Sequence, residues 1–126
     1  YSIEICDTRF VKARNIREAE IFLFSGLDQD CEMILDVRKK LAERYPRSVS
    51  AVGGPICWSF DQSGQLERLR DFDYVCIGDG EEIIGSLLED VRMGLTPDHV
   101  IRAGRRYDFS RSRLAPLPML QKNVKK

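Results

Sequence analysis

Three short groups of residues have the composition of a ligand-binding edge, and each directly follows an apolar run. A glycine at such a point permits either a turn with a positive φ or the close approach of a ligand to bare backbone. For one glycine pair considered alone, a turn is the favoured explanation. It is less strongly favoured over ligand approach when two pairs and a serine lie at the same edge. The groups are Ser25-Gly26-Leu27, Gly53-Gly54-Pro55 and Gly78-Asp79-Gly80-Glu81.

The third group does not suit a phosphate. Asp79, Glu81 and Glu82 place negative charge where a following helix would present its positive end, so a phosphate there would be repelled. The group also lacks the Lys-Ser/Thr pair of a P-loop and the spacing of a dinucleotide-binding loop. It better suits a neutral ligand rich in hydroxyl or amide groups, or an arginine from a neighbouring segment.

Covalent and metal chemistry find little support in the sequence. The one histidine, His99, falls outside the three groups, so no Ser-His or Cys-His pair can be assembled. Cys57 follows Gly-Gly-Pro, but a packed thiol is the favoured interpretation. The cysteines lie too far apart for paired zinc ligands or a close-set iron-sulfur cluster, so no metal is expected; they are Cys6, Cys31, Cys57 and Cys76.

The segments between these groups alternate between strand and helix. Asp28 is the predicted N-cap of the first helix, and Pro46 is predicted to stop it. Trp58 and Phe60 are predicted to lie in a loop. Strand patterns cover residues 1–6, 21–24, 48–54, 73–78 and 99–103, and helical patterns cover residues 28–45, 65–70 and 81–93.

This alternation predicts an α/β fold, a flavodoxin-like or Rossmann-like doubly wound parallel sheet with right-handed crossovers. In such a sheet the ligand crevice lies at the carboxyl ends of the strands, where the three groups would form one rim. The strand pattern at residues 1–6 begins at once, so we expect that the chain lacks the first strand of the fold and that this segment has an unpaired edge.

The rim residues resemble the cobalamin-binding domain family, in which a Ser-x-Leu motif precedes a Gly-Gly pair. Here Ser25-Gly26-Leu27 is followed after 25 residues by Gly53-Gly54. The chain is most similar to the version of this domain that precedes radical S-adenosylmethionine enzymes. That version has Gly-Gly-Pro and then Asp-Tyr-Val-x-x-Gly-Glu-Gly-Glu, which are matched here by Gly53-Gly54-Pro55 and by residues 73–81, and a Leu-Pro linker element similar to Leu117-Pro118.

The resemblance implies cobalamin as the cofactor. Ser25 would bond the benzimidazole of the nucleotide tail, and Gly53 and Gly54 would form the floor of its groove. The chain would be an accessory domain that presents the corrin to the barrel of a radical S-adenosylmethionine oxidoreductase or methyltransferase. S-adenosylmethionine and the [4Fe-4S] cluster would belong to that barrel, whose three-cysteine motif this chain lacks. The family's cobalt-ligating histidine loop is also missing, and no catalysis is expected from the chain alone.

The domain organisation follows from charge and composition. Residues 1–104 are predicted to form the cobalamin-binding-like domain, and residues 105–126 a basic linker toward the absent catalytic domain. Residues 102–126 hold eight Lys or Arg and a single acid, Asp108. A linker or docking segment is favoured over a nucleic-acid arm. No membrane span or secretion signal is present and the cysteines suit a reducing compartment, so a cytoplasmic location without a membrane partner is expected.

An alternative function keeps the fold without the cofactor, as a structural or substrate-docking module. Ile56, Cys57 and Trp58 would then fill the groove in place of the tail. A structure with Trp58 packed across Gly53 and Gly54 would favour this alternative. RNA binding through the basic tail is a third, weaker hypothesis, which predicts strongly salt-dependent binding.

Overall fold

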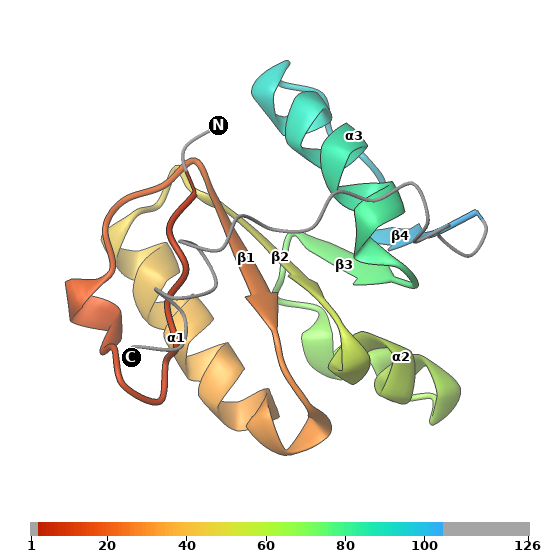
Figure 1. Ribbon diagram of the computed structural model, residues 1–126, viewed down its shortest axis with the longest axis horizontal. Helices are drawn as coiled ribbons and strands as arrows, with labels where there is room; N and C mark the ends of the chain where they lie inside the picture. The colour runs from red at the N-terminus through yellow and green to blue at the C-terminus, as the bar shows by residue number, and fades with distance from the viewer. Residues whose placement is uncertain (1–2, 105–126) are drawn as a thin grey trace, which may run out of the picture. The chain divides into compact units, whose positions relative to one another are not determined.

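A parallel sheet forms the centre of the computed structural model, which describes residues 3–104 (Figure 1). Within these residues the sheet has four strands in the order β1-β2-β3-β4, and every neighbouring pair is parallel. The predicted doubly wound α/β fold is therefore confirmed. The strands are β1 (Ile21–Ser25), β2 (Val49–Gly53), β3 (Tyr74–Ile77) and β4 (Val100–Arg102).

Helices follow the first three strands and cover both faces of the sheet. They are α1 (Cys31–Arg44), α2 (Pro55–Gln62) and α3 (Gly80–Arg92), and short 3-10 turns occupy Ala13–Asn15, Asp28–Asp30 and Leu66–Leu69. The core between the sheet and α1 and α2 includes Val52, Phe72 and Val75. A second core on the opposite face packs Ile83 and Leu87 of α3 against the sheet. Burial on both faces explains why β2 and β3 are almost continuously apolar, whereas β1 is only partly covered and Leu23 is 52% exposed.

The connection from β3 to β4 differs from the other two. The strand order advances in one direction throughout, but α3 lies on the face opposite α1 and α2. The β3-α3-β4 connection therefore has the opposite hand to the first two. The expectation that every crossover is right-handed is wrong for this sheet, since a single hand requires helices on one face when the strands follow in sequence. β4 is consequently an appended edge strand.

The start of the described chain is not a strand. Residues 3–6 have no strand pairing, although their apolar alternation predicted one. A strand exists only where a neighbour supplies a hydrogen-bonded ladder, and alternation alone supplies none. Residues 3–17 belong to a separate unit from the sheet, which lies within the unit that begins at Glu18. In the first unit the side chain of Arg9 binds that of Asp7 at 2.6 Å.

Two local predictions are also wrong. Trp58 and Phe60 lie in α2 and not in a loop, because Gly54 and Pro55 begin a helix whose apolar residues, including Phe60, face the core. Asp28 does not cap α1. The helix begins three residues later at Cys31, and the Asp28 carboxylate instead accepts a hydrogen bond from Ser59. The Asp28–Asp30 turn intervenes because Asp30 bonds back to the Leu27 amide at 2.9 Å.

The helical pattern of residues 28–45 is observed in α1, where Cys31, Ile34, Val37 and Leu41 are buried at helical spacing, and the helix ends before Pro46 as predicted. Gly94 follows α3 closely, and its amide donates to the carbonyl of Val91 at 3.1 Å. No helix among the described residues is both long and apolar enough to span a membrane.

Burial of Cys57 should make the fold sensitive to alkali. Desolvation, followed by the neighbouring Cys76, raises the pKa of the Cys57 thiol from 9.0 to about 12. The folded state therefore disfavours the thiolate. We expect the stabilisation from the neutral thiol to be complete below pH 9.0 and to decline as the pH rises toward about 12, because the unfolded chain ionises first. Urea denaturation at stepped alkaline pH measures this decline.

The matched comparison is Cys57→Ala. Its free energy of unfolding should decline less at alkaline pH than that of the unaltered protein. Cys6→Ala, at a partly exposed cysteine outside both cores, should leave the decline unchanged. An identical alkaline decline in Cys57→Ala and the unaltered chain would show that this thiol does not contribute.

Candidate functional site

The three predicted groups lie at one edge of the sheet. Ser25 ends β1, Gly53 ends β2, and the two residues are register partners. Gly78 follows β3 directly, and all three strands are parallel, so their carboxyl ends share the same edge. We refer to residues 25–27, 53–55 and 78–81 together as the rim. The edge at which ligands bind in open α/β sheets is the edge that carries the rim.

Hydrogen bonds join the first group of the rim to the start of α2. The Ile56 amide donates to the Gly26 carbonyl at 3.0 Å. The Ser59 hydroxyl donates to the carboxylate of Asp28, just after Leu27. Both bonds join the segment that follows β1 to α2, which begins at Pro55 of the second group, so the two loops are held together.

Gly54 is fixed by both its backbone and its neighbour. Its φ is +84°, and a Cβ placed there would collide with the hydroxyl oxygen of Ser25. Gly53 differs, since a Cβ there would meet Cys76 at an ordinary 3.7 Å. The glycine that is structurally required is therefore Gly54, and its bare Cα leaves space for the Ser25 hydroxyl at the exposed rim.

The third group packs against β4. Gly78 has a φ of +104°, and a Cβ there would lie 2.8 Å from the Cβ of Ala103. Gly80, in contrast, begins α3 in open space, with nothing within 4 Å of its Cβ position. Asp79 precedes the helix, and Glu81 and Glu82 occupy its first turn. The acidic helix start inferred from the sequence is thus present, and it opposes the binding of anions.

The bulky residues that follow the glycines do not cover them. Ile56 and Cys57 are fully buried in the core beside α1 and α2, whereas a Cβ on Gly53 would point toward Cys76, in the core beside α3. Trp58 is 61% exposed, and none of its atoms is among those nearest to a Cβ on Gly53 or Gly54. The arrangement that would have favoured a filled groove is therefore not observed.

His99 lies at the opposite edge of the sheet. Its ring Nδ1 is 3.0 Å from the carbonyl oxygen of Asp73, which precedes β3, and its own carbonyl accepts from Val75 at 2.7 Å. The Asp73 carboxylate accepts from the Ser50 amide at 2.8 Å and from the Ser50 hydroxyl at 3.2 Å. This Ser-Asp-His cluster fixes the starts of β2, β3 and β4. The sequence signal for it was a serine within the apolar run of β2.

The buried thiol of Cys57 is not arranged as a nucleophile. It donates to the Val52 carbonyl at 3.4 Å, and its raised pKa keeps it protonated near neutral pH. The interpretation of Cys57 as a packed thiol is confirmed. No group of three histidine, cysteine or acidic side chains within residues 3–104 is placed to hold a metal ion.

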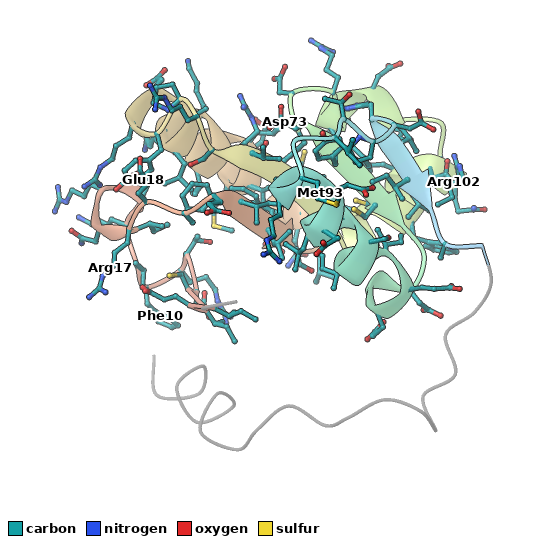
Figure 2. The ribbon with its side chains drawn as sticks, turned by 90° about the horizontal axis from the view of Figure 1, so that it is seen from above. Phe10, Arg17, Glu18, Asp73, Met93 and Arg102 are labelled. Carbon is teal, nitrogen blue, oxygen red and sulfur yellow. The ribbon has the colours of Figure 1, made fainter. Side chains whose placement is uncertain are left out.

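Sequence reasoning missed two residues that border the rim. Arg102, at the end of β4, makes a two-pronged hydrogen-bonded ion pair with Asp61 of α2, at 2.8 and 2.9 Å. Figure 2 shows Arg102 extending from β4 on the outer side of the sheet. Since the two residues lie 41 positions apart, no local pattern could reveal their pairing.

Comparison with known proteins gives one solved structure. No family model matches the chain, and no curated protein matches it. The chain is similar to the N-terminal domain of the hypothetical protein TM0182 of Thermotoga maritima, with 28% sequence identity and a TM-score of 0.54. The match covers 80% of this chain and 77% of that one. It supports the Rossmann-like α/β fold and carries no functional description.

The contact between Ser25 and Gly54 predicts unequal effects at the two glycines. We expect Gly54→Ala to lower the free energy of unfolding by about 1–3 kcal/mol, because the alanine is strained at positive φ and meets the Ser25 hydroxyl. Gly53→Ala is the matched control and should change stability by less than about 1 kcal/mol, because its Cβ makes an ordinary contact. Urea denaturation compares the two.

The double variant Ser25→Ala with Gly54→Ala separates the two causes. It should recover the part of the loss that comes from the collision and retain the part that comes from positive φ. Equal stability of Gly53→Ala and Gly54→Ala would contradict the assignment.

Proposed function

We propose that this chain is a cobalamin-binding accessory domain of a radical S-adenosylmethionine enzyme, and that the rim receives the nucleotide tail of the corrin. The proposal rests on one observation above all: the Ser25 hydroxyl lies directly against the bare Cα of Gly54. The two separate motifs of the resemblance are thus in contact at the ligand edge of the fold.

The residues of the rim fit the nucleotide tail, which is large and carries a single phosphodiester charge, in three respects. Ser25 is exposed and offers a hydroxyl to a ring nitrogen. Gly80 presents backbone with nothing within 4 Å of its Cβ position. The acids at the start of α3 disfavour a competing free phosphate or nucleotide with several charges. The bonds between the Gly26 and Ile56 loops keep this surface in place before a ligand arrives.

The chain's own residues would bind and orient the cofactor, and they would not ligate its metal. Bound cobalamin would supply methyl or electron transfer at a neighbouring catalytic domain. His99, the one histidine of the sequence, lies at the far edge of the sheet and is directed to the Asp73 carbonyl. Under this proposal no residue of this chain ligates cobalt from below. Ser25, Leu27 and the rim glycines would bind the cofactor.

A cofactor-free docking module is the second candidate. Its support is that Gly54 and Gly78 are each accounted for by positive φ and by contact with the chain's own Ser25 and Ala103. A ligand is not needed to explain them. The two candidates make opposite predictions for binding.

We expect the chain to retain hydroxocobalamin after mixing and desalting, seen as a corrin absorption band. Ser25→Tyr should abolish most of the retained band, because the larger ring would occupy the space beside Gly54. Ser63→Tyr, at an exposed serine that follows the far end of α2, is the matched control and should retain the band. The absence of a band from the folded, unaltered chain would reject cobalamin binding and favour the second candidate.

A further inference from the structure

Among residues 3–104, β4 is a short strand with β3 as its only neighbour in the sheet. It has three residues, and it pairs with β3 through Val75-Val100, Cys76-Ile101 and Ile77-Arg102. The Ala103 amide extends the pairing by donating to the Ile77 carbonyl at 2.9 Å. Val100 and Ile101 are only partly buried, one against each core. Such an edge strand has little apolar burial to hold it in place.

The ion pair between Arg102 and Asp61 adds a directional attachment. The two guanidinium nitrogens donate to the two carboxylate oxygens at 2.9 and 2.8 Å. The Asp61 side chain is 20% exposed, and the Arg102 side chain is 57% exposed. Hydrogen bonding by Arg102 holds the pKa of Asp61 below its ordinary value of 3.8. Because the ion pair is bidentate, it fixes the position of β4 relative to α2 in addition to attracting β4 toward α2.

The same strand supports the third group of the rim. Ala103 lies against Gly78, where an added Cβ would be 2.8 Å away. Ile101 and Ala103 also pack against the core that includes Ile83 of α3. The turn from β3 into α3, which carries Gly78, Asp79 and Gly80, therefore has β4 along one side. Movement of β4 would remove this support.

We propose that β4 docks and undocks as a unit, that the Asp61-Arg102 pair holds it docked, and that docking fixes the conformation of the rim at residues 78–81. The rim is thereby coupled to the chain that continues from β4. A ligand that prefers the ordered rim would strengthen docking, and docking would strengthen its binding by the same factor. The ligand part of this coupling rests on the proposed cobalamin function, whereas the docking part does not.

Hydrogen exchange measured by mass spectrometry tests the docking part without any ligand. Asp61→Asn keeps the shape of the side chain and removes its charge. We expect amide exchange in residues 100–103 and 78–82 to accelerate by at least about tenfold in this variant, while β1 and α1 keep their rates. Arg102→Gln alters the other residue of the ion pair and should give the same pattern of amide exchange.

The matched control is Asp36→Asn, which removes the charge from an exposed pair with Lys40 on α1, where Nζ and Oδ2 are 2.8 Å apart. Exchange in residues 78–82 and 100–103 should stay within about twofold of the unaltered chain. Asp61→Arg combined with Arg102→Asp restores opposite charges and should recover slow exchange. Three outcomes of Asp61→Asn would each overturn the proposal. They are faster amide exchange in β4 but not in residues 78–82, equally faster exchange in every segment, and no faster exchange in any segment.

A titration with hydroxocobalamin then tests the ligand part. The unaltered chain and the Asp36→Asn control should bind with equal affinity, and Asp61→Asn should bind at least about fivefold more weakly. Equal affinity in all three proteins would overturn the coupling while leaving the proposed function intact. Failure of the unaltered chain to bind would reject the proposed function, and the exchange experiment alone would then decide whether β4 controls the rim.

Discussion

Parallel pairing of β1, β2 and β3 is the constraint on which the site depends. In a parallel sheet every carboxyl end lies at the same edge, so loops separated by 25 and 22 residues in the sequence become neighbours. The register adds the decisive detail, because Ser25 and Gly53 are partners and Gly54 follows immediately. The helices on both faces make this pairing stable by burying the strands that supply it.

The rim glycines show how an internal constraint and a binding surface can share the same residues. Gly54 is required by its positive φ and by the nearby Ser25 hydroxyl, and Gly78 by its own φ and by Ala103. These requirements belong to the folded chain itself. They nevertheless leave a hydroxyl exposed beside bare backbone, which is the chemistry that the proposed ligand would use. A glycine motif of this kind is evidence of close packing first and of ligand binding second.

The two edges of the sheet have different polar attachments. At the amino edge, Ser50 and Asp73 join the starts of β2 and β3 by partly buried hydrogen bonds, and the His99 ring lies 3.0 Å from the Asp73 carbonyl oxygen in a more exposed contact. At the carboxyl edge, β4 relies on the more exposed pair of Asp61 and Arg102. Exposed charge pairs are weaker and more sensitive to solvent than buried hydrogen bonds. The edge that carries the rim is therefore the more readily rearranged of the two, which would suit the proposed binding of a ligand there.

The sequence by itself determined most of the elements and the placement of the rim, although it predicted a loop in place of α2. Buried strands and amphipathic helices could be predicted because local periodicity shows which side of a segment is apolar. In α1, for example, Ile34, Val37 and Leu41 are buried at helical spacing. The tertiary structure alone decided that residues 3–6 form no strand, that α3 crosses on the opposite face, and that Arg102 pairs with Asp61. It also decided that Gly54 faces Ser25 and that Trp58 does not pack over Gly53 and Gly54. Each of these outcomes depends on contacts between distant segments, and no periodicity within one segment records which partner it will meet.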